Sequence, residues 1–322
     1  MIQLKTLLFR HYGLNARQIV PSSGGWSALA YRVETDERIF FLKMYEKNRA
    51  STPKWTALID HYVPLLLRLG QRSVLQGKLP VPVPTLDGRC KCENDEGIYL
   101  LYEHIDGDTI GSRPLTKRQV GQLAEIVAEL HACDRATLAE SGTALAQRFT
   151  EDFSLPFLSA LERSVLDRLP LLEADIRGAI APYVRPLRSH MEHALKLGLS
   201  LKDRPLRYGL CHTDLHNWNL MTSGDHLILI DWEGMKLAPA EADWMFVADR
   251  PYADEFLDLY RRRHPGFTID TDALRFYRLR RKLEDIWEFA EQLLFDEQDA
   301  EERAETLNLL QDELRSMTET AI

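Results

Sequence analysis

The 322-residue chain has no apolar run approaching the ~20 residues that a membrane-spanning helix needs. Residues 1–6 also lack the basic and long apolar stretches of a secretory signal. Cysteine is scarce, and the C-x-C pair at 90–92 has no neighbouring second pair to complete a structural zinc site. The sequence therefore predicts a cytoplasmic protein with reduced thiols, no membrane partner and no disulfide scaffold.

Positive charge is also in short supply. The chain has 40 basic and 49 acidic residues, a net charge of −9, which disfavours nucleic acid as a partner. Residues 284–322 contain thirteen acids and two bases, so this segment carries −11 and the rest of the chain +2. The acidic segment is either a solvated helix face or a negative wall for a cationic ligand, and both interpretations stay open.

Strand patterns are concentrated in the first third of the chain. Residues 28–45 alternate apolar and polar side chains around a turn at 34–37, which indicates a hairpin, and a second hairpin is indicated over 88–102. Beyond residue 105 helical spacing dominates, apart from a strand–loop–strand at 208–232. A capping-box pattern at 116–119 indicates the start of one helix, and breaks are expected near the prolines at 156, 170 and 182. This order predicts an α+β protein with a small β-rich lobe at 1–103 and a larger, mainly helical lobe at 104–322.

One polar loop lies between two apolar strands, in the segment LCHTDLHNWNL at 210–220. Asp214 is its candidate base. Asn219, together with Asp231 after the apolar run 227–230, offers oxygen ligands of the kind that Mg²⁺ prefers. The alternative is a buried loop whose histidines and aspartates only satisfy backbone groups. The polar loop and the apolar run that ends in Asp231 are two patterns with mechanical roles, and their occurrence one after the other favours the catalytic interpretation.

The pattern His-x-Asp-x-x-x-x-Asn from His212 to Asn219 resembles the catalytic loop of protein-kinase-like enzymes, and Asp231-Trp-Glu resembles their metal-binding triplet. The spellings are similar to those of the aminoglycoside phosphotransferase family, and the resemblance covers roughly residues 15–295. It implies a two-lobed protein-kinase-like fold, with ATP and Mg²⁺ as cofactors. Residues 210–216 and 277–294 also resemble the members of the family that phosphorylate spectinomycin.

In the small lobe, the resemblance assigns a phosphate loop, a phosphate-binding lysine and an adenine-binding connection: Ser23, Gly24, Gly25, Lys43, the Glu103 carbonyl and the Ile105 amide. Taken alone, the two glycines indicate a simple turn and Lys43 an edge-strand charge. Residues 51–75 lack the glutamate with which a kinase lysine pairs. We therefore expect Asp60 to pair with Lys43, with Glu46 as the alternative.

Three further residues are expected to support the loop. His212 is interpreted as a brace, and His216 as either a support or a phosphate contact. Asp243, shortly after the metal triplet, fits a structural role.

The acceptor is sought near residue 284. Glu284, Glu288 and Glu291 share one helical face, with Asp285 and Trp287 beside them. Carboxylates bind ammonium groups through charge-assisted hydrogen bonds, and tryptophan adds cation–π attraction. Several alternatives remain: a solvated face, a core position for Trp287, or neighbouring arginines that bind an acidic acceptor or pair with Glu284 and Asp285. These arginines are Arg278, Arg280 and Arg281.

The resulting hypothesis is an ATP- and Mg²⁺-dependent O-phosphotransferase, monomeric or homodimeric, acting on a cationic small molecule such as an aminoglycoside or a spectinomycin-like antibiotic. A second hypothesis keeps the chemistry but has a housekeeping acceptor, such as an amino alcohol or a sugar. A third is a kinase-like module that binds nucleotide without catalysis.

Overall fold

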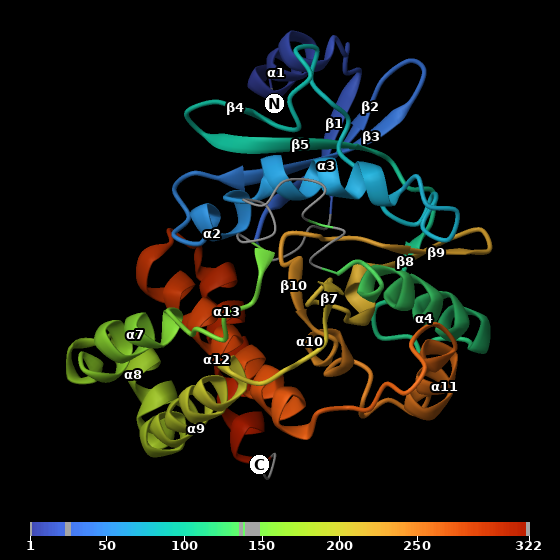
Figure 1. Ribbon diagram of the computed structural model, residues 1–322. Helices are drawn as coiled ribbons and strands as arrows, with labels where there is room; N and C mark the ends of the chain where they lie inside the picture. The colour runs from blue at the N-terminus through green and yellow to red at the C-terminus, as the bar shows by residue number, and fades with distance from the viewer. Residues whose placement is uncertain (1, 23–26, 135–137, 139–148, 320–322) are drawn as a thin grey trace.

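The computed structural model describes residues 2–22, 27–134, 138 and 149–319. A sheet forms the core of a small lobe, at the top of Figure 1, and a larger helical lobe lies below it. The predicted α+β, two-lobed kinase-like fold is confirmed.

The small lobe is an antiparallel sheet in the order β1-β2-β3-β5-β4. The predicted hairpin is β2 and β3, in which Ala30 lies opposite Lys43, and β3 then pairs with β5. The strands have these bounds: β1 Gln18–Ser22, β2 Leu29–Glu34, β3 Ile39–Glu46, β4 Cys92–Glu93 and β5 Gly97–Glu103.

Helices cover both faces of this sheet (Figure 1). Helix α1 (Ile2–Tyr12) packs with Leu42 and Met44 on one face, whereas α3 (Ile59–Leu69), after the short α2 (Thr52–Thr56), packs with Tyr45 on the other. Successive strand residues point to opposite faces, so Lys43 shares the α3 side with Tyr45. The sheet thereby directs Lys43 toward the larger lobe.

The chain leaves the small lobe after Glu103. Strand β6 (Asp108–Thr109) already pairs with β8 (Leu220–Ser223), which forms a hairpin with β9 (His226–Leu229). Gly107 stands against this sheet, where an added Cβ would lie 2.0 Å from the Thr222 carbonyl oxygen. The crossover thus requires a glycine, and the exact division of the chain at residues 103 and 104 stays a prediction.

The predicted capping box is present at the start of α4, where the Thr116 side chain accepts from Gln119 N and the Gln119 side chain accepts from Thr116 N. The breaks expected near Pro156, Pro170 and Pro182 also occur, since these residues lie at the starts of short helices. The remaining elements are α4 Lys117–His131, α7 Phe157–Leu161, η1 Glu162–Leu166, η2 Leu169–Leu171, α8 Ala174–Ile180, η3 Ala181–Tyr183, α9 Val184–Lys202, β7 Tyr208–Cys211, η4 Asn217–Asn219, β10 Lys236–Pro239, α10 Glu241–Trp244, α11 Ala253–Arg263, α12 Thr271–Phe295 and α13 Ala300–Glu319.

The acidic segment begins on helix α12. Its N-cap, Asp270, accepts hydrogen bonds from two backbone amides of the first turn. One face of the helix is buried in the core of the large lobe through Leu283, Ile286 and Phe289, and α13 packs alongside. The other face therefore carries the charged residues 280, 281, 284, 285 and 288 toward the rest of the protein.

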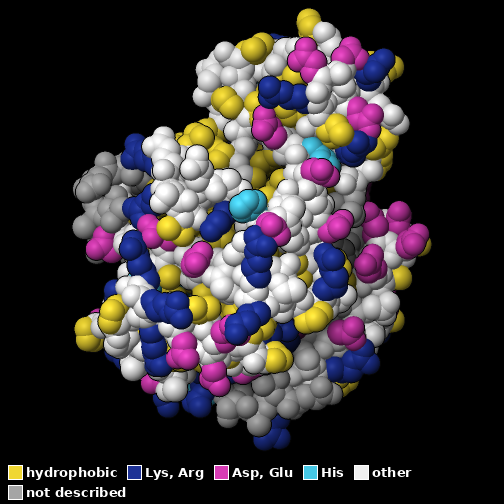
Figure 2. Space-filling view, turned by 90° about the vertical axis from the view of Figure 1, so that its right-hand side faces the viewer, with side chains coloured by type: hydrophobic (Ala, Val, Ile, Leu, Met, Phe, Trp, Pro, Cys, Tyr) yellow, Lys and Arg dark blue, Asp and Glu magenta, His cyan; other side chains and the backbone are white. Residues whose placement is uncertain are grey.

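The surface has mixed charge. On the face shown in Figure 2, acidic and basic side chains are interspersed, without a broad field of one sign. Among the described residues, no helix combines the length and the apolar character needed to cross a membrane.

Gly107→Ala should destabilise the protein by at least about 2 kcal/mol, because the new methyl group overlaps the β8 backbone. The matched control is Gly121→Ala in α4, where an added Cβ meets nothing within 4 Å and should stabilise the helix by about 0.5–1 kcal/mol. Urea unfolding of both variants measures this. Equal stability of the two would show that the crossover does not need glycine.

Candidate active site

The loop after β7 is held from within by His212, which is fully buried. Its backbone N–H donates to Asp243, its Nε2 lies 2.9 Å from the Ile230 carbonyl oxygen, and its Nδ1 accepts from Asp214 N at 3.2 Å. The ring therefore ties the loop to the segment just before Asp231, as a brace would.

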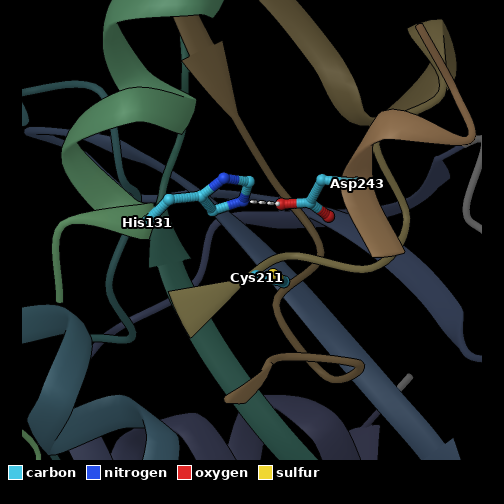
Figure 3. A group of neighbouring side chains, drawn as sticks. All are labelled: His131, Cys211 and Asp243. Carbon is cyan, nitrogen blue, oxygen red and sulfur yellow. Dashed lines mark hydrogen bonds and ion pairs between the residues drawn. The ribbon is translucent and has the colours of Figure 1, made fainter. Parts of the chain in front are cut away.

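A buried trio anchors the same loop from below (Figure 3). Asp243 Oδ2 lies 3.0 Å from His131 Nε2, and Asp243 Oδ1 accepts from Thr213 N at 2.6 Å. Cys211 is the third member, with ligand-type atoms of all three within 4.8 Å of one another. His131 Nδ1 is occupied by the Tyr260 hydroxyl, and burial raises the pKa of the Cys211 thiol. Since each member already has protein partners, the trio is best explained as an anchor.

Asp214 is surrounded by donors. Asn219 Nδ2 donates to its Oδ2 at 2.8 Å, while Arg281 Nη1 donates to its Oδ1 at 2.6 Å and His216 Nε2 lies 3.3 Å from the same oxygen. Burial raises the pKa of Asp214, but the His216 hydrogen bond and the Arg281 charge outweigh it and hold that pKa well below its usual range. Asp214 is therefore an ionised carboxylate that can accept a hydrogen bond from a hydroxyl group.

Asn219 and Asp231 lie side by side, since Ile230 N donates to the Asn219 carbonyl at 3.0 Å. Asn219 uses Nδ2 for both of its side-chain hydrogen bonds, to Asp214 O and Oδ2, which leaves its Oδ1. Asp231 has a left-handed backbone, with φ of 63°, and is about one-third exposed. The Asn219 amide and the Asp231 carboxylate are oxygen ligands of the kind that a hard divalent cation such as Mg²⁺ prefers.

Lys43 reaches across from the small lobe to this group. Its Nζ lies 2.9 Å from Asp231 Oδ1 and 2.6 Å from Glu233 Oε1, and the Tyr45 hydroxyl also donates to Glu233. Burial lowers the pKa of Lys43, but the two carboxylates more than compensate and raise it well above its usual value. The lysine is charged and joins the lobes.

The expected pairing of Lys43 with Asp60 is wrong. Asp60 lies in the first turn of α3, where it contacts Lys91 at 2.6 Å. The alternative, Glu46, is also wrong, because its carboxylate accepts from Arg49. The partner of Lys43 is therefore Glu233 from the large lobe, and not an acid of helix α3.

Glu233 is the third residue of the triplet that resembles a metal-binding motif, and the sequence alone assigns it no role. It lies two residues after Asp231, at a turn, and its carboxylate meets the same Lys43 ammonium as that of Asp231. Trp232 points the other way, where its buried ring contacts His212 with ring centres 4.7 Å apart.

The nucleotide end of the cleft is only partly described. Ser23, Gly24 and Gly25 lie outside the described residues. The Glu103 side chain is exposed and pairs with Arg38 at 3.0 Å. No hydrogen bond to the Ile105 N–H occurs within the described part of the chain, which leaves that amide available as the sequence expectation requires.

The acidic face of α12 is largely neutralised. Arg280 pairs with Glu284 at 3.0 Å and with the buried Glu151, while Arg281 pairs with Asp285 at 2.9 Å. Of the alternatives open from the sequence, the pairing of these arginines with acids is therefore the one observed. Burial raises the pKa of Asp285 to about 6, against the lowering effect of Arg281.

Two members of the predicted acceptor set differ in their surroundings. Among the described residues, Glu288 has one ion-pair partner, Lys54 of the small lobe, at 3.6 Å, and burial raises the pKa of its carboxyl. Trp287 is 8% exposed and packs in the core of the large lobe. Its ring therefore has no open face for a cation, and the prediction that Trp287 contacts the acceptor is wrong.

Comparison with known proteins adds the family. The model of the Phosphotransferase enzyme family (APH) matches residues 18–277, most of the chain. The chain belongs to this family. Protein StrN of Streptomyces griseus is 25% identical over 232 residues, which cover 67% of this chain and 65% of that relative, so the match spans less than two thirds of StrN.

Solved structures show the same fold as this phosphotransferase-family chain. Spectinomycin phosphotransferase in complex with ADP and spectinomycin is 20% identical, with a TM-score of 0.73 over 98% of this chain and 97% of that one. A microcompartment-associated aminopropanol kinase is 16% identical, with a TM-score of 0.62 over 99% and 97%. An aminoglycoside phosphotransferase crystallised with AMP-PNP and hygromycin B has a TM-score of 0.58 at 15% identity, over 99% and 98%.

Lys43→Met should destabilise the protein by about 3–5 kcal/mol, because it leaves Asp231 and Glu233 facing each other without their cation. Lys91→Met is the matched control, since Lys91 also pairs with an aspartate but one that is 57% exposed, and it should cost about 0–1 kcal/mol. Denaturant unfolding measures both. A larger loss of stability in Lys91→Met than in Lys43→Met would instead assign the structural role to the pair of Lys91 and Asp60.

Proposed function

We propose that the protein is an ATP- and Mg²⁺-dependent O-phosphotransferase that acts on a hydroxyl of a cationic small molecule. One observation carries the proposal: Lys43 contacts Asp231, the neighbouring Ile230 donates its N–H to the Asn219 carbonyl, and Asn219 contacts Asp214, which links the small lobe to the catalytic loop. This is the arrangement that phosphoryl transfer needs, with a phosphate-binding lysine, oxygen ligands for a cation and a carboxylate for the acceptor hydroxyl.

In the proposed mechanism each residue has one task. Lys43 binds the phosphate tail of the nucleotide, and the Ile105 amide and Glu103 carbonyl bind the adenine. Asn219 and Asp231 would hold Mg²⁺, which when bound neutralises phosphate charge. Asp214 orients the acceptor hydroxyl and receives its proton as the oxygen attacks the γ-phosphorus. His212, His216 and Asp243 keep the loop in place.

The charges beside Asp214 favour an acceptor with few ammonium groups. Glu284 and Asp285 are already paired with arginines, whereas Lys54 lies 3.6 Å from Glu288 and is itself 48% exposed. An acceptor ammonium can replace the Lys54 ammonium at Glu288. One such site suits a mono- or diamine better than a polycation with several charges to match.

Two classes of acceptor are candidates. The similarity in fold to the phosphotransferase solved with ADP and spectinomycin supports a spectinomycin-like aminocyclitol. A small amino alcohol is the second candidate, because Glu288 offers a single ammonium site.

Mass spectrometry of small molecules incubated with the protein and Mg-ATP tests the function. We expect a gain of one phosphoryl group on a spectinomycin-like aminocyclitol, and Asp214→Ala should lower turnover by a factor on the order of 10²–10⁴. Turnover on amino alcohols alone would select the second candidate. If neither the wild-type protein nor Asp214→Ala phosphorylates any acceptor, the result would instead favour a non-catalytic module.

Glu288→Gln should raise KM for the cationic acceptor by about tenfold, the effect of losing one charge-assisted hydrogen bond, and leave KM for ATP unaltered. Glu162→Gln is the control, because Glu162 also pairs with one basic residue, Arg188, but lies in the remote helix η1. Steady-state kinetics with each substrate varied in turn gives both constants. An equal rise for ATP and acceptor would count against an ammonium site at Glu288.

A further inference from the structure

Arg281 differs from the two arginines that precede it on α12. Arg278 points outward to the exposed Asp249, and Arg280 is buried between Glu151 and Glu284. Arg281 alone of the three touches the catalytic loop, through Asp214. Its side chain is 34% exposed, so it is neither fully buried nor fully open to solvent.

The guanidinium is held firmly on one edge. Asp285, one turn further along α12, binds Nε at 2.9 Å, and the Phe246 ring lies beneath the guanidinium carbon at 5.8 Å from the ring centre. A guanidinium has five N–H donors. Only two of them have partners among the described residues, Nε with Asp285 and one Nη1 hydrogen with Asp214. The other three point from a half-open position beside the candidate base.

That position coincides with the place where charge develops. A hydroxyl that gives its proton to Asp214 must lie within hydrogen-bond distance of that carboxylate. Its oxygen must also lie about 3–3.5 Å from the phosphorus that it attacks. Arg281, at 2.6 Å from Asp214 Oδ1, is therefore one small side-chain movement away from the transferred phosphoryl group.

The cations that this site can use are divided between two sides. Lys43 contacts Asp231 and Glu233, on the side of the nucleotide phosphate tail. Arg281 contacts Asp214, on the side from which the acceptor approaches. A transferred phosphoryl group passes from the first side to the second, so a cation on the acceptor side stabilises the transition state more than the bound substrate.

We propose that Arg281 is a catalytic residue whose free N–H donors bind the γ-phosphoryl oxygens during transfer. In the reaction the acceptor oxygen forms a bond to the γ-phosphorus, and the bond from that phosphorus to the β–γ bridging oxygen breaks. The electron pair leaves with ADP, and the hydroxyl proton goes to Asp214. Arg281 stays on Asp285 through Nε and turns its other donors from Asp214 to the phosphoryl group. This inference rests on the proposed phosphotransferase function.

The test uses ADP, Mg²⁺ and aluminium fluoride, which together mimic the phosphoryl group in transfer and contain no acceptor. Arg281→Met should weaken binding of this complex by about 10²-fold and leave the affinity for ADP alone unchanged. Arg281→Lys, which keeps the charge but not the planar fork, should lose less. Arg278→Met is the matched control, from the same helix and also paired with an aspartate, and should behave as the wild type.

Three results would overturn the proposal. The first is wild-type affinity of Arg281→Met for the fluoride complex, because a residue that only orients Asp214 or the acceptor has no effect on an acceptor-free mimic. The second is an equal loss for ADP and for the fluoride complex, which would indicate general damage to the cleft. The third is a rise in acceptor KM with unchanged kcat. Failure of all acceptors in the panel, by contrast, bears on the proposed acceptor and not on Arg281.

Discussion

The pairing of buried charge determines how this cleft is built. Lys43, Glu233, Glu151 and Arg280 all have side chains that are at most 14% exposed, and each is in contact with a group of opposite charge. An uncompensated charge in such a place costs several kcal/mol, so each partner fixes the position of the next. Because Glu233 belongs to the large lobe and Lys43 to the small one, this requirement also holds the two lobes together.

Most of the fold could be predicted from the sequence because it follows from local patterns. Alternation around the 34–37 turn specified the β2–β3 hairpin, and the Thr116 capping box specified the start of α4. The loop with His212, Asp214 and Asn219 was also readable as a short polar segment between two apolar strands, although these strands, β7 and β8, belong to different sheets. The hairpin and the cap depend on contacts that are local in the sequence, whereas the loop is also held by the more distant Asp243.

The failures came from contacts between distant segments. Nothing near Lys43 in the sequence indicates that its partners are 188 and 190 residues away, so the nearest helix acid, Asp60, was chosen instead. The acidic run on α12 was similarly interpreted from its own spacing. The pairing of Glu284 with Arg280, four residues before it, was one of the alternatives that the sequence left open. The contact of Arg280 with Glu151, from a different segment, becomes visible only in the tertiary structure.

The paired charges on α12 also explain how one helix can serve both structure and recognition. Arg280, Glu284 and Glu151 connect helix α12 to the segment before α7, where Lys236 of β10 also contacts Glu151, and this fixes the direction in which residue 281 points. With its position fixed, Arg281 can contact Asp214 without closing the cleft. Glu288, two turns on, then faces Lys54 of the small lobe, whose ammonium also lies 4.2 Å from the Trp55 ring centre. The Trp55 ring is a second partner for the Lys54 ammonium. Lys54 therefore keeps a partner when an acceptor ammonium displaces it from Glu288.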